Sequence, residues 1–132
     1  MRIVARPYDT PIRYDTVCFL SDLGTDDELA GVVRAVLRDL APHAHTVDLT
    51  HGIPPFDVRA GALALVRAIA YVPAGVILAS VDPTVGSTRR AIAVEVAGGD
   101  GVVIGPDNGL LAPAIALTGG AERAVVLTNP EY

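Results

Sequence analysis

GVILASVDPTVGSTRR, residues Gly75–Arg90, begins as an apolar run that predicts a buried strand and then turns polar at Asp82. Pro83 cannot continue a central strand and Gly86 permits a left-handed turn, so the chain must bend directly after that carboxylate. Arg89 follows in the same loop. Open α/β sheets bind their ligands at the carboxyl ends of buried strands, where side chains are held firmly. The segment therefore predicts either a structural ion pair that braces the turn or a pair of catalytic residues.

The rest of the chain alternates strand-like and helix-like patterns around this segment. An apolar stripe at helical spacing follows three acids, which favour a helix N-terminus, and Ala97–Asp100 separates two apolar runs as a hairpin turn would. This alternation predicts an α/β fold, a three-layer sandwich with a mostly parallel central sheet and a C-terminal antiparallel hairpin. The predicted strands cover 16–21, 46–50, 76–81, 91–96, 101–105 and 124–127, and the predicted helices cover 29–40, about 58–71 and 110–117.

The helix predicted over about 58–71 is apolar on nearly every side, with Arg59 and Arg67 as its only charges. We expect it to be buried almost all round, either between the sheet and a second layer or against another subunit. Asp57 precedes it directly and is expected to cap its N-terminus.

Size and composition bound the class of protein. The 132 residues amount to one domain, with 1–15 predicted as a flexible N-terminal arm and 16–132 as the α/β domain. A net charge of −5 argues against a nucleic-acid partner, and no apolar run is long enough to cross a bilayer or to form the core of a signal peptide. We therefore expect a cytoplasmic protein with neither a membrane nor a nucleic-acid partner. Cys18, the only cysteine, lies in an apolar run and is expected to be a buried hydrophobe.

Polar residues follow the predicted parallel strands, and a parallel arrangement brings them to one edge of the sheet. Asp22 follows the first strand, where a carboxylate accepts hydrogen bonds from a vicinal diol such as a ribose or forms a turn. Asp27 is expected to cap a helix, with contact to a ligand ammonium or a metal as the alternative. Asn108 is a ligand contact or a turn residue. His51 is a base or, more commonly for a histidine in a proline-rich turn, bonded to local backbone.

Several common site motifs are absent from the sequence, which has no phosphate-cradling glycine loop, no nucleophile elbow and no zinc pattern. His43 and His45 have the spacing of a metal chelate, but nothing nearby supplies a third ligand, so we expect them to face solvent. No metal is expected. The residues alone predict an acid-lined α/β site for a polar or cationic nucleoside.

Four segments occur in an order and at a spacing that resemble those of a known family. They are LSDLG over Leu20–Gly24, VDLTHGIPPFDVR over Val47–Arg59, VDPTVGSTR over Val81–Arg89 and GPDNGLL over Gly105–Leu111. Together they resemble the N-terminal domain of the S-adenosyl-L-methionine (SAM) hydroxide adenosyltransferases, the hydrolase relatives of fluorinase and chlorinase. The resemblance covers residues 16–132, and four motifs in order make it specific.

The resemblance implies hydrolysis of SAM, in which water or hydroxide attacks the 5′ carbon and releases adenosine and methionine. The sulfonium leaves as neutral methionine, so neither a metal, a cofactor nor a general acid is required. In the family's hydrolases an Asp–Arg–His triad holds the water, and Asp82 and Arg89 match its first two members. The halogenases carry an aromatic residue at the Asp82 position, which favours hydrolysis over halide transfer. An anionic site also suits a cationic substrate.

The same matching implies the substrate contacts. Asp22 matches the residue that grips the ribose hydroxyls, and Asp27 matches a contact to the methionine end. Phe56 occupies a position that packs near the ligand in the halogenases. Asn108, in the fourth motif, is the remaining expected substrate contact.

Two departures from the family pattern bear on activity. Thr84 stands where the hydrolase motif usually has glycine, which adds a side chain to the tight loop. The sequence also ends at Tyr132, before the family's histidine-bearing segment and its C-terminal domain, which supplies the adenine pocket to a neighbouring subunit of a trimer. We therefore expect a homotrimer when the C-terminal domain is present, and little or no activity from these 132 residues alone.

Two other functions stay open. The half domain would be a non-catalytic nucleoside- or SAM-binding or assembly module if it acts without the C-terminal domain. Alternatively, SDLGTDDELA over Ser21–Ala30 resembles the calcium-binding motif of nucleoside hydrolases. That motif expects Asp at the Leu20 position and Pro at the Leu23 position, so its calcium cage would be incomplete here.

Overall fold

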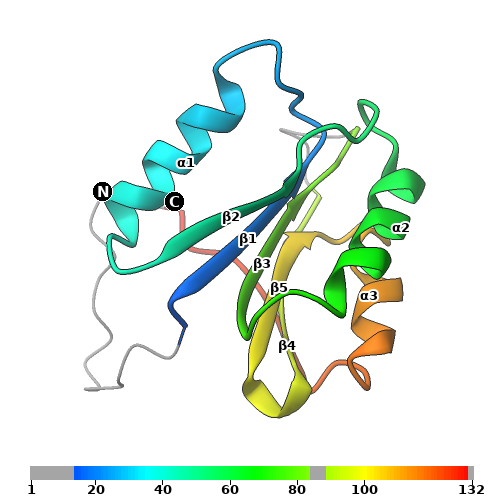
Figure 1. The fold of residues 1–132 in the computed structure, drawn as a ribbon. Coiled ribbons are helices and arrows are strands. Elements are labelled where there is room, and N and C mark those ends of the chain that lie inside the picture. The colour runs from blue at the N-terminus through cyan, green and yellow to red at the C-terminus, as the bar shows by residue number, and fades with distance from the viewer. Residues whose placement is uncertain (1–13, 84–88, 131–132) are drawn as a thin grey trace.

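A six-stranded mixed sheet lies at the centre of the computed structural model, which describes residues 14–83 and 89–130 (Figure 1). The strand order is β2-β1-β3-β5-β4-β6, in which β2, β1, β3 and β5 are parallel and β4 is antiparallel to both β5 and β6. The elements are β1 (Thr16–Ser21), α1 (Leu29–Leu40), β2 (His45–Thr50), α2 (Val58–Ile69), β3 (Gly75–Ser80), β4 (Ala91–Val96), a short 3-10 turn (Ala97–Gly99), β5 (Gly101–Pro106), α3 (Ala112–Leu117) and β6 (Arg123–Val126).

The helices lie on both faces of the sheet. Figure 1 shows α1, which joins β1 to β2, on one face and α2 with α3 on the other. The predicted three-layer α/β sandwich, its mostly parallel sheet and its C-terminal antiparallel hairpin are therefore confirmed. From β1 the chain moves outward to β2 and then crosses back to β3 on the other side of β1. Such a reversal opens a crevice at the carboxyl ends of the two strands, here β1 and β3.

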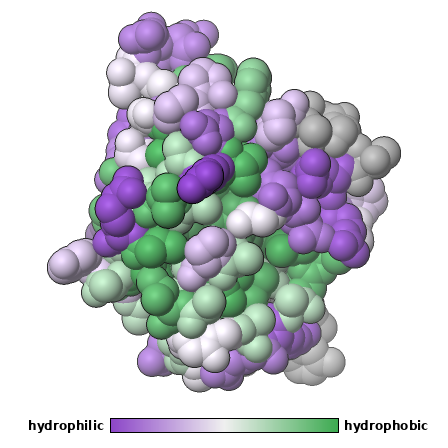
Figure 2. Space-filling model, turned by 90° about the vertical axis from the view of Figure 1, so that its right-hand side faces the viewer, coloured by the Kyte–Doolittle hydropathy of each residue, from purple (hydrophilic) through white to green (hydrophobic). Residues whose placement is uncertain are grey.

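The hydrophobic core lies between the sheet and the layer that α2 and α3 form. Alternate residues of β3 point into it, and Leu65 of α2 and Leu110 before α3 are fully buried there. Cys18 is also buried in this cluster, as expected from its apolar neighbours. Most residues of α2 are buried or half-buried, and the exposed ones form a stripe on its outer side, where Leu63 is 49% exposed. The sheet and α3 therefore leave one side of α2 uncovered, and burial of this side against another subunit stays a prediction. Figure 2, which faces this side of the molecule, shows apolar and polar surface intermixed.

Local signals set the helix ends as predicted. The backbone N–H of Ala60 donates to Asp57 Oδ1 at 2.9 Å, so Asp57 caps α2. α1 ends at Leu40, just before Pro42, which cannot continue a helix. The helix predicted over 110–117 begins later, at Ala112, because the preceding residues form the turn that leaves β5.

Some expectations concern parts of the chain that the structure does not describe. Most of the predicted arm over 1–15 and the unusual Thr84 lie outside the described residues. His43 and His45 are described and are exposed, as expected. Within 14–83 and 89–130, no helix combines the length and the apolar character needed to cross a membrane.

Candidate active site

Asp82 and Arg89 face each other at the two ends of the loop after β3. Arg89 Nε lies 3.6 Å from Asp82 Oδ1. Asp82 is only 8% exposed, whereas the Arg89 side chain is 35% exposed and its Nη1 also donates to the carbonyl of Asp107 at 3.2 Å. The loop therefore holds a sheltered carboxylate against a guanidinium that is itself hydrogen-bonded to the residue after β5. Residues 84–88, between the two, lie outside the described part.

Asp22 lies at the same edge of the sheet, at the end of the neighbouring strand β1. Its backbone N–H donates to the carbonyl of Ser80 at 3.3 Å, which ties it to the end of β3. Its Oδ2 accepts the backbone N–H of Phe56 at 2.8 Å. Phe56 has a φ of 66°, in the left-handed region that a non-glycine residue seldom adopts, and it is 61% exposed. The predicted convergence of Asp22 and Asp82 on one edge is thus present in the fold, and the Phe56 backbone lies beside Asp22.

Asn108 uses both ends of its amide on backbone groups. Its Nδ2 donates to the carbonyl of Val81 at 3.0 Å, and its Oδ1 accepts the N–H of Leu110 at 3.0 Å. The side chain therefore forms the turn that leaves β5 and fastens it to the end of β3, one residue before Asp82. This geometry bears out the turn interpretation and leaves a substrate contact by Asn108 as a prediction.

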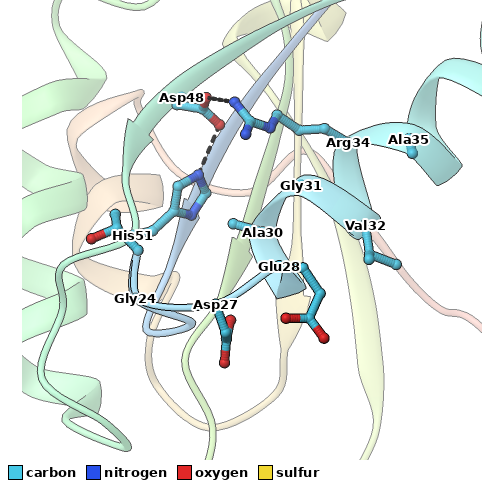
Figure 3. A pocket seen from close by; sticks show the side chains of 11 residues that line it. Gly24, Asp27, Glu28, Ala30, Gly31, Val32, Arg34, Ala35, Asp48 and His51 are labelled. Atoms are coloured by element: carbon cyan, nitrogen blue, oxygen red, sulfur yellow. Dashed lines mark hydrogen bonds and ion pairs between the residues drawn. The ribbon is translucent and has the colours of Figure 1, made fainter.

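Asp27 lies at the start of α1, where its Oδ1 accepts the N–H of Leu29 at 3.0 Å, as a helix-capping acid does. The side chain is exposed and borders a cavity of about 530 Å³ between α1 and the carboxyl ends of β1 and β2 (Figure 3). The cavity carries both acidic and basic groups on its wall. Its lining residues are Gly24, Thr25, Asp27, Glu28, Ala30, Gly31, Val32, Arg34, Ala35, Asp48 and His51.

Sequence reasoning missed a chain of four hydrogen-bonded polar side chains, of which Arg34, Asp48 and His51 line this cavity and Ser21 is buried. Ser21 Oγ lies 2.6 Å from His51 Nδ1, His51 Nε2 lies 2.8 Å from Asp48 Oδ1, and Arg34 Nη1 donates to Asp48 Oδ2 at 2.6 Å. Figure 3 shows His51 and Arg34 directed at the Asp48 carboxylate from different elements. The expectation that His51 bonds to local backbone is wrong, because both ring nitrogens meet side chains. The only part of this chain that the local sequence could have indicated is the Asp48–His51 pair, whose members lie three residues apart. Ser21 and Arg34 reach this pair only because the chain folds.

The arrangement at this edge can accept hydrogen bonds and attract positive charge. A carboxylate such as Asp22 accepts hydrogen bonds from ligand hydroxyls, and several acids together favour a cationic ligand. An ion pair such as Asp82–Arg89 offers a water molecule one acceptor and one donor. Among residues 14–83 and 89–130, no group of three or more His, Cys, Asp or Glu side chains is placed to hold a metal ion.

Known proteins resemble this chain over most of its length. An (R)-S-adenosyl-L-methionine hydrolase of Salinispora tropica is 48% identical over 116 residues, which is 88% of this chain and 44% of the relative. A fluorinase of Nocardia brasiliensis is 28% identical over 141 residues, covering 90% of this chain and 47% of that enzyme. A crystal structure of a conserved hypothetical protein from Thermus thermophilus superimposes with a TM-score of 0.76 at 44% identity, over 88% of this chain and 48% of that one.

The chain therefore spans about half the length of the curated relatives it matches. Residues 17–132 match the family model for the SAM hydroxide adenosyltransferase N-terminal domain. That match begins within β1, runs past β6 and includes all four sequence motifs. The chain belongs to the SAM hydroxide adenosyltransferase N-terminal domain family.

Proposed function

We propose that this chain is the N-terminal part of a SAM hydrolase, which converts SAM and water to adenosine and L-methionine and needs no cofactor. The observation that carries the proposal is the sheltered Asp82 held 3.6 Å from Arg89 at the strand end next to Asp22. A relative that shares 48% identity bears the name of that hydrolase, which supports the same substrate.

The proposed reaction is a displacement at the 5′ carbon of SAM. The oxygen of a water or hydroxide forms a bond to this carbon while the carbon–sulfur bond breaks. The electron pair of the broken bond stays on sulfur, so the positive sulfonium leaves as the neutral thioether of methionine, and the surplus proton of a water nucleophile passes to solvent. Since the leaving group needs no protonation, catalysis rests on holding the nucleophile in line and away from bulk water.

Asp82 and Arg89 would hold that nucleophile. The Asp82 carboxylate accepts a hydrogen bond from the water and orients its lone pair, and the Arg89 guanidinium donates to the oxygen of the water and pairs with the Asp82 carboxylate. An ionised carboxylate beside the reaction path also favours the approach of a sulfonium cation. The ion pair therefore serves both the nucleophile and the substrate.

The remaining predicted residues would hold the substrate. Asp22 would accept hydrogen bonds from the two ribose hydroxyls, and the exposed Phe56 ring beside it offers an apolar surface for the nucleoside. Asp27 would contact the methionine ammonium from the border of the cavity. Asn108 would act mainly through the turn it forms next to Asp82, with substrate contact as a second role.

Residues beyond this chain would complete the site. The relatives are about twice as long, so we propose that their second half supplies the third member of the triad and the adenine pocket, in a homotrimer in the cytoplasm. In this arrangement residues 1–15 would be an arm and 16–132 the N-terminal domain.

Product analysis in oxygen-18 water tests the proposal. The purified chain would be incubated without added metal with SAM, alone and mixed with a separately expressed C-terminal half of the Salinispora tropica relative, and adenosine and methionine would be quantified by chromatography with mass detection. We expect adenosine that carries the oxygen-18 label, in the mixture only, and loss of this product in Asp82→Asn. Asp39→Asn is the matched control, because Asp39 is an exposed acid on α1, at the end remote from the site.

Other results assign other functions. Labelled homoserine instead of adenosine would place the attack on the methionine side chain, and calcium-dependent release of free adenine would mark a nucleoside hydrolase. Binding of SAM without any product in either tube would indicate a binding module. An Asp82→Asn chain that remains as active as Asp39→Asn would refute the role of the ion pair.

A further inference from the structure

The polar chain Ser21–His51–Asp48–Arg34 links β1, α1, β2 and the turn after β2 beside the candidate site, and its function follows from its hydrogen bonds. Ser21 ends β1, Arg34 lies on α1, Asp48 lies in β2, and His51 follows β2. Ser21 is fully buried and His51 is 9% exposed, whereas Asp48 and Arg34 open toward the cavity. Burying a polar side chain costs free energy unless its donors and acceptors form hydrogen bonds. We therefore expect every donor and acceptor of Ser21 and His51 to have a hydrogen-bond partner.

For a neutral imidazole, the direction of each hydrogen bond follows from its two partners. An Asp48 carboxylate only accepts, so His51 Nε2 must carry the hydrogen in the 2.8 Å contact with Asp48 Oδ1. The Nδ1 of a neutral imidazole then accepts, and Ser21 Oγ–H donates to it at 2.6 Å. Ser21 Oγ also accepts the backbone N–H of Leu23 at 3.2 Å. The hydrogen bonds therefore run in one direction from the turn after β1, through the imidazole, to the carboxylate.

The order Ser–His–Asp is that of a nucleophilic triad, but this geometry excludes a nucleophile. Ser21 has no exposed surface, and its oxygen already contacts both Leu23 and His51. A substrate carbon cannot reach it. The chain of bonds must therefore act on the position of neighbouring groups.

Those groups are the loops that carry the candidate ribose contacts. Ser21 directly precedes Asp22, and the carbonyl of His51 accepts the backbone N–H of Gly24 at 2.8 Å. Residues on both sides of Asp22 are thus hydrogen-bonded to His51: Ser21 to its imidazole and Gly24 to its backbone carbonyl. Asp22 then accepts the N–H of Phe56, whose positive φ needs such support.

We propose that His51 is a positioning residue, which acts through Ser21 to hold the Asp22 carboxylate in the orientation that binds the ribose diol. The ligand named in this inference, the ribose diol, rests on the proposed function, whereas the positioning of Asp22 by His51 rests on the hydrogen bonds alone. Asp48 and Arg34 serve it by fixing the tautomer and the ring orientation of His51.

Substitutions at His51 separate the two ring contacts. Asparagine is short and its amide reaches the position of Nδ1, so His51→Asn keeps an acceptor for Ser21 and loses the bond to Asp48. Glutamine reaches the position of Nε2, so His51→Gln keeps the bond to Asp48 and loses the one to Ser21. Ser21→Ala removes the hydroxyl itself and makes the smallest change in volume. Thr118→Val is the matched control, because Thr118 Oγ1 donates to the carbonyl of Ile115 at 2.7 Å in the remote α3 turn.

The first readout needs no ligand. Long-range nitrogen–proton NMR spectra of the chain are expected to show the Nε2–H tautomer of His51. Hydrogen exchange of the Phe56 amide is expected to accelerate at least about tenfold in Ser21→Ala and His51→Gln, but not in His51→Asn or Thr118→Val. An Nδ1–H tautomer, or unchanged Phe56 exchange in a folded Ser21→Ala, would overturn the inference.

The second readout compares adenosine with 2′,3′-dideoxyadenosine in NMR titrations. A wild-type preference of about tenfold for adenosine is expected from a carboxylate that grips the diol, and it should fall to about twofold or less in Ser21→Ala and His51→Gln. If the wild type shows no preference, the ribose role of Asp22 fails while hydrogen exchange still decides the positioning role. If the wild type shows the preference and Ser21→Ala retains it, the inference about His51 fails alone.

Discussion

Gly61 in α2 packs against Val81, the residue before Asp82, so replacing this glycine tests how the fold supports the candidate site. A Cβ added to Gly61 of α2 would lie 2.8 Å from Leu110 Cδ1 and 3.1 Å from Val81 Cγ2. Both of these side chains are fully buried, and Val81 directly precedes Asp82. A Cβ on Gly31 of α1 would meet only Arg34 Nη2, at 4.0 Å. The two glycines therefore differ in packing and share a helical backbone.

Both Gly→Ala changes gain about 0.5–1 kcal/mol from the greater helix propensity of alanine. Gly31→Ala should keep this gain and raise the free energy of unfolding by that amount. Gly61→Ala must also push apart two core side chains, and overpacking of a core costs about 1–3 kcal/mol. The two variants should thus differ by about 1–3 kcal/mol, with Gly61→Ala the less stable.

Urea denaturation followed by circular dichroism measures this difference, provided that both variants keep the wild-type dependence on urea concentration. Because the added methyl group presses on Val81, NMR shifts should also change at Asp82 in Gly61→Ala and stay unchanged in Gly31→Ala. A Gly61→Ala chain as stable as Gly31→Ala would refute the reasoning, since it would mean that Leu110 and Val81 yield without cost.

Three further outcomes follow from single contacts. Asp57→Ala should lower the free energy of unfolding by about 1 kcal/mol through loss of the α2 cap, measured by urea denaturation. Asn108→Ala should cost about 1–3 kcal/mol, because it leaves the Val81 carbonyl and the Leu110 amide without their partner, and a loss under about 0.5 kcal/mol would contradict this. Burial raises the pKa of the Cys18 thiol, so the unfolded chain loses this proton first as the pH rises. Stability should therefore fall above about pH 8.5, and this slope should vanish in Cys18→Ala.

Most of the fold could be predicted because its signals are local. The apolar stripe of α1, the break at Pro42 and the Ala97–Asp100 turn each act over a few residues, and the elements they predict are present with ends shifted by one or two positions. The burial of α2 could not be predicted in the same way. Apolar residues on nearly every side of a helix indicate how much of its surface could pack. How many other elements cover that surface depends on the rest of the fold.

The candidate site divides along the same line. Asp82 and Arg89 are close in sequence and belong to one loop, so a strand that ends in Asp-Pro was enough to single them out. The hydrogen bond from the Phe56 backbone amide to Asp22 joins residues 34 positions apart, and the hydrogen bond between Ser21 and His51 joins residues 30 positions apart. No local sequence pattern predicts either of these two contacts.

The sequence by itself determined the strands and helices, the family and the carboxylates at the strand ends, because periodicity, turn residues and motif spacing are properties of short segments. Only the tertiary structure decided that β1 lies between β2 and β3, and this strand order brings the end of β1 within reach of both the loop after β2 and the end of β3. Ser21 thereby meets His51 while Asp22 meets both Phe56 and the Ser80 carbonyl. Contacts between neighbouring strands depend on sheet order and register, which are set by the packing of the whole domain.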